Sequence, residues 1–456
     1  MSRTRSHQRT FLIPRTMTLL ITGKALLLVL LSCGLCAALV NNGRKPSHGK
    51  YVACYFQSWA IFRNGDGVFQ IQDIKPEYCT HLVYSFAGLN GTTFQIKSLD
   101  PWADLDDHNG KDGYRKLTQL RYQHPGLKVS LAIGGWNEGS YNYSEMARYP
   151  EHRKRFVNSV VHFLRAYNFQ GLDLDWEFPT ARGGADYDRH NYILLLQDLK
   201  RAFREHDFLL TAVISADTES MGRRYDIRMM SEYLDYIHVM TYDYHVLEGG
   251  VIMPNAPLDE VNKTLDYLVR SGAPIRKFIL GLPTYGRSYI LATALRSQEE
   301  NPIGKPSLKN SWSGPYNTQE GFMGYNEICK YLLSNGSWID KWDNLSSTPY
   351  AIMQHRVIVY DNAKSLQAKV RLAMRKGLGG VMIWSIDTDD FRGDCRPTHG
   401  RNHVDAQDYQ YPLMQAIGFA LERDSSGQPL ALPALGLVLL CLILHPLSLP
   451  QLGLGH

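Results

Sequence analysis

The chain has 456 residues, a length that allows about three domains or one α/β barrel with additions. It holds 49 Lys and Arg against 44 Asp and Glu, but five of the basic residues and none of the acidic ones lie in the first 38 positions. The remainder is therefore neutral, which excludes reading the net charge of +5 as a sign of nucleic-acid binding. With 44% hydrophobic and 20% charged residues, the composition is that of a globular protein and not of a disordered one.

Both ends of the chain carry apolar runs. The run from Ala25 is followed by the small pair Ala37-Ala38 and predicts a secretory signal peptide over residues 1–38; the alternative is a signal anchor that stays in the membrane. At the other end, Ser425-Ser426-Gly427 precedes a Leu-rich tail. Residues 422–456 are thus expected to be a linker and a GPI-attachment signal, with a transmembrane tail or an apolar extension as alternatives. We expect a secreted, extracellular protein with membrane attachment through this tail.

Four cysteines lie outside these end segments: Cys54, Cys79, Cys329 and Cys395. In an exported chain this even number predicts two disulfides, for which three connectivities are open. Pairing each cysteine with its neighbour in the sequence would give Cys54–Cys79 and Cys329–Cys395. Five sequons predict N-glycosylation, each a weak signal, at Asn90, Asn142, Asn262, Asn335 and Asn344.

Eight short runs rich in apolar or β-branched residues predict strands: Val52–Phe56, Leu82–Phe86, Lys128–Ile133, Gly171–Asp175, Leu209–Ser215, Tyr236–Thr241, Phe278–Pro283 and Gly380–Ser385. Amphipathic stretches of helical period lie between most of them: Glu151–Tyr167, Arg189–Arg204, Leu258–Ser271 and Ala363–Arg375. This alternation predicts an α/β fold, a (β/α)8 TIM barrel over residues 50–421. The seventh and eighth runs start 102 residues apart, which predicts a small α+β insertion at about 287–355, between strand 7 and helix 7.

The fourth run ends in three acids at alternate positions, Asp173, Asp175 and Glu177. Alternate strand residues share a face, so the three carboxylates point into the barrel, where burying them is costly. Like charges this close cannot all ionise. We expect Asp173 and Asp175 to share a proton or a negative charge, which leaves Glu177 protonated near neutral pH as a general acid.

Three uses of these acids compete. A divalent metal would need ligands from several strands, and only His238 and His245 on the sixth run offer any. A structural salt-bridge network is the second alternative. Sugar chemistry is favoured because aromatic residues whose flat faces stack on sugar rings lie at the strand ends: Tyr55, Trp59, Trp102, Trp136, Tyr242 and Trp384.

The segment GLDLDWEFP at 171–179 resembles the signature of the family-18 glycoside hydrolases. The resemblance covers roughly Lys50 to Leu421 and is most specific to single-catalytic-domain insect chitinases. Further matching segments are CYF at 54–56, YSFAG at 84–88, AIGGWN at 132–137, MTYD at 240–243, PTYGRS at 283–288 and GGVMIWSID at 379–387.

The resemblance implies an endo-acting chitinase that hydrolyses β-1,4-linked N-acetylglucosamine with retention, as a monomer, on chitin or chitooligosaccharides, without metal or other cofactor. Glu177 would protonate the glycosidic oxygen while the substrate's own acetamido group attacks, oriented by Asp175 and Tyr242. Asp173 would tune Asp175. Substrate-binding residues would be Tyr55, Phe86, Pro101, Trp102, Gly134, Gly135, Trp136, Asn137, Phe178, Met240, Thr241, Tyr242, Asp243, Arg287 and Trp384. The family disulfides match Cys54–Cys79 and Cys329–Cys395.

Three positions depart from the family pattern. Gln170 stands where an Asp usually supports the acid row, Phe178 replaces a common Tyr, and the segment 246–248 lacks a usual Trp. These departures favour a weak or specialised enzyme. The competing hypothesis is a chitin-binding, lectin-like protein that does not cut, but silent relatives usually lose the acid at the position of Glu177, which is present.

Overall fold

The structure is a computed structural model that describes residues 48–245, 249–297, 299–308, 311–334, 336–395 and 409–425. The predicted signal peptide, the tail beyond residue 425, Asn335 and the segment 246–248 lie outside the described residues. Among the helices that are described, none is both long and apolar enough to cross a membrane.

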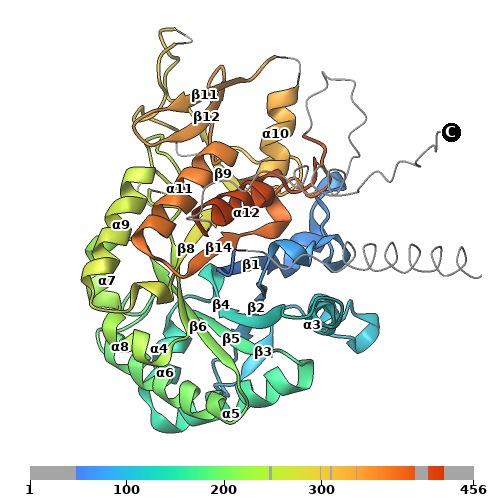
Figure 1. Cartoon of the computed structure of the whole chain (residues 1–456), viewed down its shortest axis with the longest axis vertical. Helices are drawn as coiled ribbons and strands as arrows, with labels where there is room; N and C mark the ends of the chain where they lie inside the picture. The colour runs from blue at the N-terminus through green and yellow to red at the C-terminus, as the bar shows by residue number, and fades with distance from the viewer. Residues whose placement is uncertain are drawn as a thin grey trace, which may run out of the picture. The chain divides into compact units, whose positions relative to one another are not determined.

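Eight parallel strands form a closed barrel at the centre of the fold (Figure 1). Around the ring they follow the order β1-β14-β8-β7-β6-β5-β4-β2, and pairing of β1 with β2 closes it. All eight predicted runs coincide with these strands, so the predicted barrel is confirmed. Their bounds are β1 (Tyr51–Gln57), β2 (His81–Leu89), β4 (Lys128–Gly134), β5 (Gly171–Asp175), β6 (Leu209–Ser215), β7 (Tyr236–Met240), β8 (Phe278–Pro283) and β14 (Gly380–Trp384).

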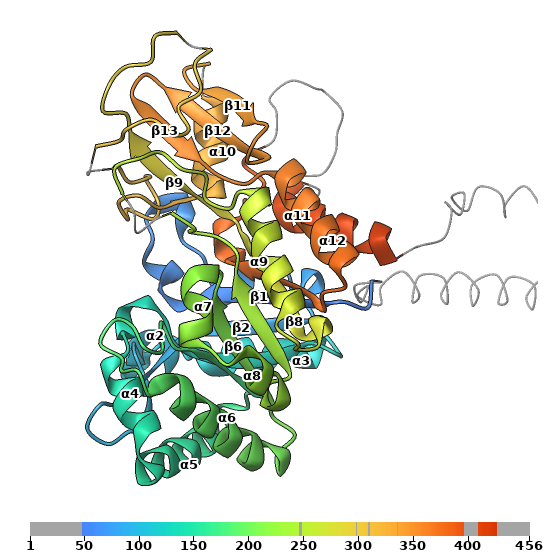
Figure 2. The ribbon, with the colours of Figure 1, turned by 90° about the vertical axis from the view of Figure 1, so that its left-hand side faces the viewer.

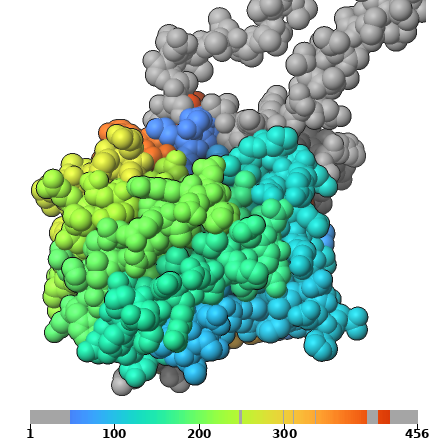
Figure 3. Space-filling model, turned by 90° about the horizontal axis from the view of Figure 1, so that it is seen from below, coloured from blue at the N-terminus to red at the C-terminus, as the bar shows by residue number. Residues whose placement is uncertain are grey.

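Helices surround the barrel (Figure 2), and the segments drawn in cyan and green make up most of the face seen in Figure 3. The four stretches predicted as helices correspond to α5, α6, α9 and α11, within one residue at each end. The bounds are α2 (Pro101–Asp104), α3 (Gly113–Gln123), α4 (Tyr141–Arg148), α5 (Pro150–Tyr167), α6 (Asp188–Arg204), α7 (Thr218–Arg224), α8 (Ile227–Tyr233), α9 (Leu258–Arg270), α11 (Ala363–Lys376) and α12 (Pro412–Ser425).

Strand alternation separates two apolar layers. Leu172 and Leu174 of β5 pack with the surrounding helices, whereas Ala132, Val213 and Met382 fill the barrel interior. Burying one leucine contributes about 1.5–3 kcal/mol, and a shift of one residue would exchange the leucines of β5 for its carboxylates. The apolar face of β5 therefore fixes the inward direction of its acids.

A second sheet of five antiparallel strands, in the order β10-β9-β13-β12-β11, lies between β8 and α11 in the chain. This is the predicted insertion. It begins with β9 immediately after β8, and the ribbon views show it to one side of the barrel together with α10 (Figures 1 and 2). The bounds are β9 (Tyr285–Ile290), β10 (Met323–Gly324), α10 (Tyr325–Leu333), β11 (Ile339–Asp343), β12 (Thr348–Met353) and β13 (Arg356–Val359); a short strand β3 (Ile96–Ser98) extends the barrel sheet beside β2.

Two disulfides join the expected partners. Cys54 of β1 is bonded to Cys79, and Cys329 of α10 is bonded to Cys395 after β14. The second bond ties the insertion to the loop after the last barrel strand. Cys329, Cys395 and Asp390 also form a group of potential metal ligands in the described part of the chain, but both sulfurs are used in the disulfide, so the group offers no thiolate.

Candidate active site

Asp173 is the best-supported acid of the row. Its fully buried carboxylate accepts hydrogen bonds from the hydroxyls of Tyr55 and Thr211, both at 2.5 Å, and lies 3.2 Å from Nδ1 of His238. Burial alone would raise the pKa of Asp173, but the charge of His238 and these hydrogen bonds outweigh it and lower the pKa. Asp173 is therefore the member of the row that carries the negative charge.

Asp175 and Glu177 have the opposite environment. Oδ1 of Asp175 is buried without a hydrogen-bond partner among the described residues, and burial followed by the charges of Glu177 and Asp173 raises its pKa well above the usual range. Burial raises the pKa of Glu177 to about 7, while the charge of Arg182 lowers it and that of Asp243 raises it. Glu177 thus keeps a transferable proton at neutral pH, and the main cause is burial and not the repulsion among the three acids on which the prediction rested.

Four aromatic side chains, Tyr55, Trp59, Phe86 and Trp384, form a group that we call the floor cluster. Trp384 stacks on Phe86 with 5.7 Å between ring centroids, and Phe86 stacks on Trp59 at 6.0 Å. Tyr55 lies 5.5 Å from Trp384 and donates its hydroxyl to Asp173, which connects the floor cluster to the acid row. These rings come from the ends of β14, β2 and β1, three consecutive strands of the ring.

The insertion reaches the site through Arg287 of β9. Its guanidinium donates to both oxygens of Asp243, at 2.7 and 2.5 Å, and Tyr285 donates to the same carboxylate at 2.7 Å. Tyr242, the residue before Asp243, lies in the barrel interior with its hydroxyl 3.7 Å from Sδ of Met382. The pair of Arg287 and Asp243 therefore fixes the loop that presents Tyr242.

Two arginines and two aromatic rings form a second group, the arginine–aromatic row, in the order Arg182, Trp136, Phe178, Arg224. The guanidinium carbon of Arg182 lies 3.5 Å from the centroid of a Trp136 ring, and that of Arg224 lies 4.6 Å from the Phe178 centroid. Trp136 and Phe178 meet edge to face at 6.5 Å. Arg182 also donates to the backbone carbonyl of Glu177 at 3.0 Å, so the row is attached to the last acid of the acid row.

Some predicted binding residues have other roles. Thr241 is fully buried and donates its hydroxyl to the carbonyl of Gly281, so it is not available to a ligand. Gly134 and Gly135 have φ of 115° and 84°, and a Cβ at Gly134 would lie 2.1 Å from the Asp175 carbonyl. The two glycines thus let β4 approach β5 and Phe86 closely, which is a packing role.

The remaining predicted binding residues lie at the surface or near the interior. Asn137 is exposed beside Trp136, and Met240 packs against the interior cluster. Exposed Pro101 begins α2, and Trp102 stacks on Phe62 at 5.6 Å with Nζ of Lys111 4.8 Å from its ring.

Sequence reasoning missed several contributors. His238 was considered only as a weak metal ligand, and Thr211, Arg182 and Arg224 were not considered. The signal for His238 and Thr211 was strand alternation, which places both inside the barrel next to Asp173. No sequence pattern indicates the two arginines, because they approach the rings from loops and a helix end.

The structure gives Gln170 no contact with the acid row. Its side-chain oxygen accepts from the backbone N–H of Val129, and Asp173 is held by residues of β1, β6 and β7 instead. That Gln170 weakens the activity stays a prediction. The segment 246–248, where the usual Trp is missing, lies outside the described residues.

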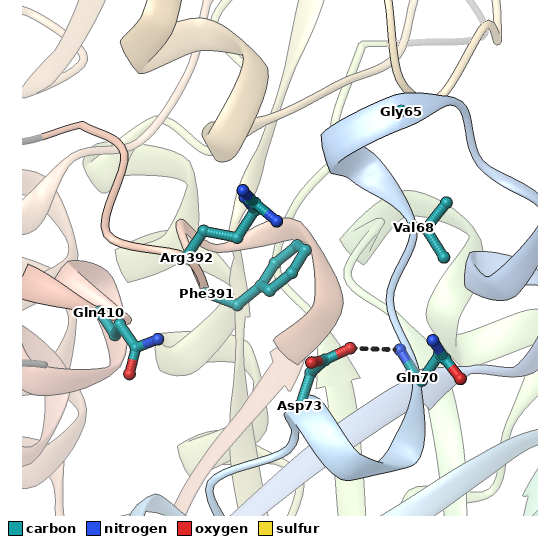
Figure 4. Close-up of a pocket in the computed structure, with 7 residues that line it drawn as sticks. All are labelled: Gly65, Val68, Gln70, Asp73, Phe391, Arg392 and Gln410. Atoms are coloured by element: carbon teal, nitrogen blue, oxygen red, sulfur yellow. Dashed lines mark hydrogen bonds between the residues drawn. The ribbon is translucent and has the colours of Figure 1, made fainter. Parts of the chain in front are cut away.

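A cavity of about 450 Å³ lies apart from these acids (Figure 4). It is formed by the loops after β1 and β14, and Asp73 in it accepts a hydrogen bond from the backbone of Gln70 at 2.8 Å. Arg392 at its edge pairs with Asp66 and Asp394. The lining residues are Gly65, Val68, Gln70, Asp73, Phe391, Arg392 and Gln410, none of which belongs to the predicted site.

The sequons differ in their surroundings. Asn344 is exposed in the turn between β11 and β12, and Asn90 Oδ1 accepts from two backbone N–H groups. Asn142 and Asn262 lie on helices α4 and α9, and Nδ2 of Asn262 donates to Asp266. Glycosylation at these positions stays a prediction.

Residues 51–389 match the family Glycosyl hydrolases family 18. The chain belongs to this family. It is 44% identical over 401 residues to "Probable chitinase 2" of Drosophila melanogaster, an alignment that covers 84% of this chain and 80% of the relative.

Two solved structures that are similar to this chain differ in their described function. A Group IV chitinase of Ostrinia furnacalis in complex with allosamidin is 36% identical with a TM-score of 0.75, covering 82% of this chain and 99% of that one. Human YKL-39, described as a pseudo-chitinase with retained chitooligosaccharide binding, is 29% identical with a TM-score of 0.70, covering 82% and 100%. The family thus includes a chitinase and a protein that only binds.

Proposed function

We propose that the chain is an endo-acting chitinase that hydrolyses β-1,4-linked N-acetylglucosamine polymers with retention, using Glu177 as general acid. The observation that carries the proposal is the division of charge in the acid row. Asp173 is held ionised by three partners, whereas Glu177, with a pKa of about 7, keeps its proton. A protein that only bound sugar would have no need of a buried, protonated acid at this position.

The reaction that suits this arrangement needs no second carboxylate as nucleophile. Glu177 donates its proton to the glycosidic oxygen as the bond to the anomeric carbon breaks. The acetamido oxygen of the same sugar forms the new bond to that carbon, giving an oxazolinium ion. Water then attacks the anomeric carbon from the face that the leaving group left, as the bond to the acetamido oxygen breaks. The water gives a proton to the carboxylate of Glu177, so the acid is restored and the configuration is retained. This route is a recognised exception to the scheme with two catalytic carboxylates.

Asp175 is suited to orient the acetamido group. Its buried Oδ1 lacks a partner among the described residues, so it is available to accept the N–H of the acetamide. The adjacent charge of Asp173 favours the positive charge that develops there. Tyr242, which follows β7, would donate its hydroxyl to the acetamido oxygen, with Trp384 below the sugar ring.

Hydrolysis of a fluorogenic chitotrioside by the full chain tests the proposal, with Glu177→Gln as the variant. We expect the variant to lose about 10²–10⁴-fold in kcat while it still binds chitooligosaccharide, because Gln keeps the shape and removes the proton. Equal rates for both proteins would contradict the role of Glu177. Binding without hydrolysis by the unchanged chain would support the lectin-like alternative that YKL-39 represents.

The location of the protein is a separate proposal. We infer export through the secretory route, glycosylation, and attachment by a GPI anchor that replaces the apolar tail. Release of the protein from intact cells by a phosphatidylinositol-specific phospholipase would support the anchor. Retention in the membrane after this treatment would favour a transmembrane tail.

A further inference from the structure

The arginine–aromatic row carries two positive charges, of which that of Arg182 acts on the proposed general acid Glu177. Neither Arg182 nor Arg224 forms an ion pair with a carboxylate in the described ranges, and each guanidinium lies against a ring instead. Their charges reach Glu177 and Asp217 only at longer range. Since Glu177 is neutral when it acts as an acid, it does not balance the charge of Arg182 in the working form, whereas Arg224 has Asp217 at longer range.

The row and the floor cluster lie on different arcs of the barrel. The floor cluster comes from β1, β2 and β14, and the row comes from residues that follow β4, β5 and β6. Glu177 follows β5, the middle strand of the row's arc, and Trp384 ends β14, four strands away around the ring. In the proposed reaction, a sugar on Trp384 would present its glycosidic oxygen to Glu177, and the next sugar, which leaves, would extend along the row.

We propose that Arg182 and Arg224 determine specificity on the leaving-group side by rejecting a positively charged sugar there. The leaving sugar would have to be N-acetylglucosamine, which is neutral, because glucosamine carries an ammonium group in weakly acidic solution. The inference rests on the proposed chitinase function and adds which sugar is accepted next to the cleaved bond. It applies to partly deacetylated chitin, where both sugars occur in one chain.

Three acids near Glu177 are paired, buried or occupied, and Asp217 acts on Arg224 only at longer range. Asp243 is neutralised by Arg287, and Asp173 is fully buried with three partners inside the barrel. Asp175 has a raised pKa and is occupied by the acetamido group in the proposed reaction. The two guanidinium groups are left to act on the leaving sugar.

Brief digestion of long, randomly and partly acetylated chitosan by the full chain provides the test. Each cleavage creates a new non-reducing end from the leaving sugar and a new reducing end from the sugar on Trp384, and mass spectrometry identifies both. Repulsion between two unit charges ~7 Å apart, even with the dielectric constant of water, lowers the rate about threefold. We expect glucosamine at new non-reducing ends to be depleted at least about threefold relative to the polymer, and the depletion to shrink in high salt.

Arg182→Gln, Arg224→Gln and the double variant should restore glucosamine at non-reducing ends toward the polymer average. The matched control is Arg121→Gln, because Arg121 also lies over an aromatic ring, Tyr122, but on α3. This control should keep the depletion of the unchanged chain. Since the result is a ratio of products from one enzyme, partial loss of folded protein does not affect it.

Three outcomes are decisive. Restoration in the arginine variants but not in the control supports the inference. Equal glucosamine at the new non-reducing ends of all four variants and the unchanged chain overturns it while the chitinase function stands. No cleavage of fully acetylated chitohexaose, or glucosamine at new reducing ends, overturns the proposed function and with it this inference.

Discussion

The two aromatic groups that flank the acid row are held in different ways. In the floor cluster rings support rings: Trp384 stacks on Phe86, and Phe86 stacks on Trp59. In the arginine–aromatic row each ring has a guanidinium against it, from Arg182 or Arg224. Stacking of neutral rings depends on contact area and little on salt, whereas cation–π contacts add charge at the same place.

This difference assigns different tasks to the two sides. In the proposed reaction, the sugar that is attacked by its own acetamido group needs a flat, apolar surface, which the floor cluster would supply. The sugar that leaves needs only to be positioned and released. A charged side of the cleft adds selectivity by charge to the selectivity by shape.

The largest expected effect comes from removing a ring on the floor side. Trp384→Ala should lower kcat/KM by at least about 100-fold and the free energy of unfolding by about 3 kcal/mol, because it removes the platform and leaves three rings without their partner. Trp136→Ala should cost only about tenfold in kcat/KM and under about 1 kcal/mol in stability, since 44% of Trp136 is exposed. Kinetics on chitooligosaccharides and chemical denaturation measure both. Equal losses would show that the two groups share one task.

The second effect concerns Glu177, the acid between the two aromatic groups, and is measured as the free energy of unfolding. The pKa of Glu177 is about 7 in the folded chain, above its unfolded value of about 4.3, so the folded state favours the proton. The stability that protonated Glu177 contributes to the folded state is fully present below pH ~4 and is lost as the pH rises through about 7. Glu177→Gln should therefore be more stable than the unchanged chain at pH 8, by on the order of 2 kcal/mol, and equally stable at pH 4. A pH-independent difference in unfolding free energy would contradict the raised pKa.

Much of the fold follows from patterns of period two and 3.6. The apolar runs of Leu209–Ser215 and Phe278–Pro283 coincide with β6 and β8 because strands buried on both faces are continuously apolar. The direction of Asp173, Asp175 and Glu177 follows from the same alternation. The long interval between the seventh and eighth predicted strands interrupts the alternation of strands and helices. This interval indicates additional residues, and it predicted the insertion.

The sequence did not predict which residues surround and hold these groups. The partners of Asp173 come from β1, β6 and β7, so no local window contains them. The two arginines reach their rings from different segments, Arg182 from the loop after β5 and Arg224 from the end of α7. Thr241 was expected to bind substrate because it lies in the segment MTYD of the resemblance, whereas its hydroxyl donates to the carbonyl of Gly281.

Tyr55→Phe separates the two roles of the residue that joins the floor cluster to the acids. The variant keeps the ring against Trp384 and removes the hydrogen bond to Asp173. We expect about a tenfold loss in kcat with little change in KM, and a loss of about 1–2 kcal/mol in stability, because Asp173 loses a buried donor. Tyr114→Phe is the control, since its hydroxyl donates to buried Asp104 away from the site. A change in KM alone would place Tyr55 in the floor cluster only.

The smallest effect is a shift of the pH profile in Arg182→Gln. The charge of Arg182 lowers the pKa of Glu177 against burial and Asp243, so its removal raises that pKa. Glu177 acts in its protonated form, and the alkaline limb of kcat/KM should therefore move upward by roughly half a pH unit. Arg224→Gln, whose guanidinium lies over Phe178 and not beside Glu177, should leave this limb in place while it changes the choice of leaving sugar. The two arginines would then share the exclusion of charge, and only Arg182 would set the pH range of the acid.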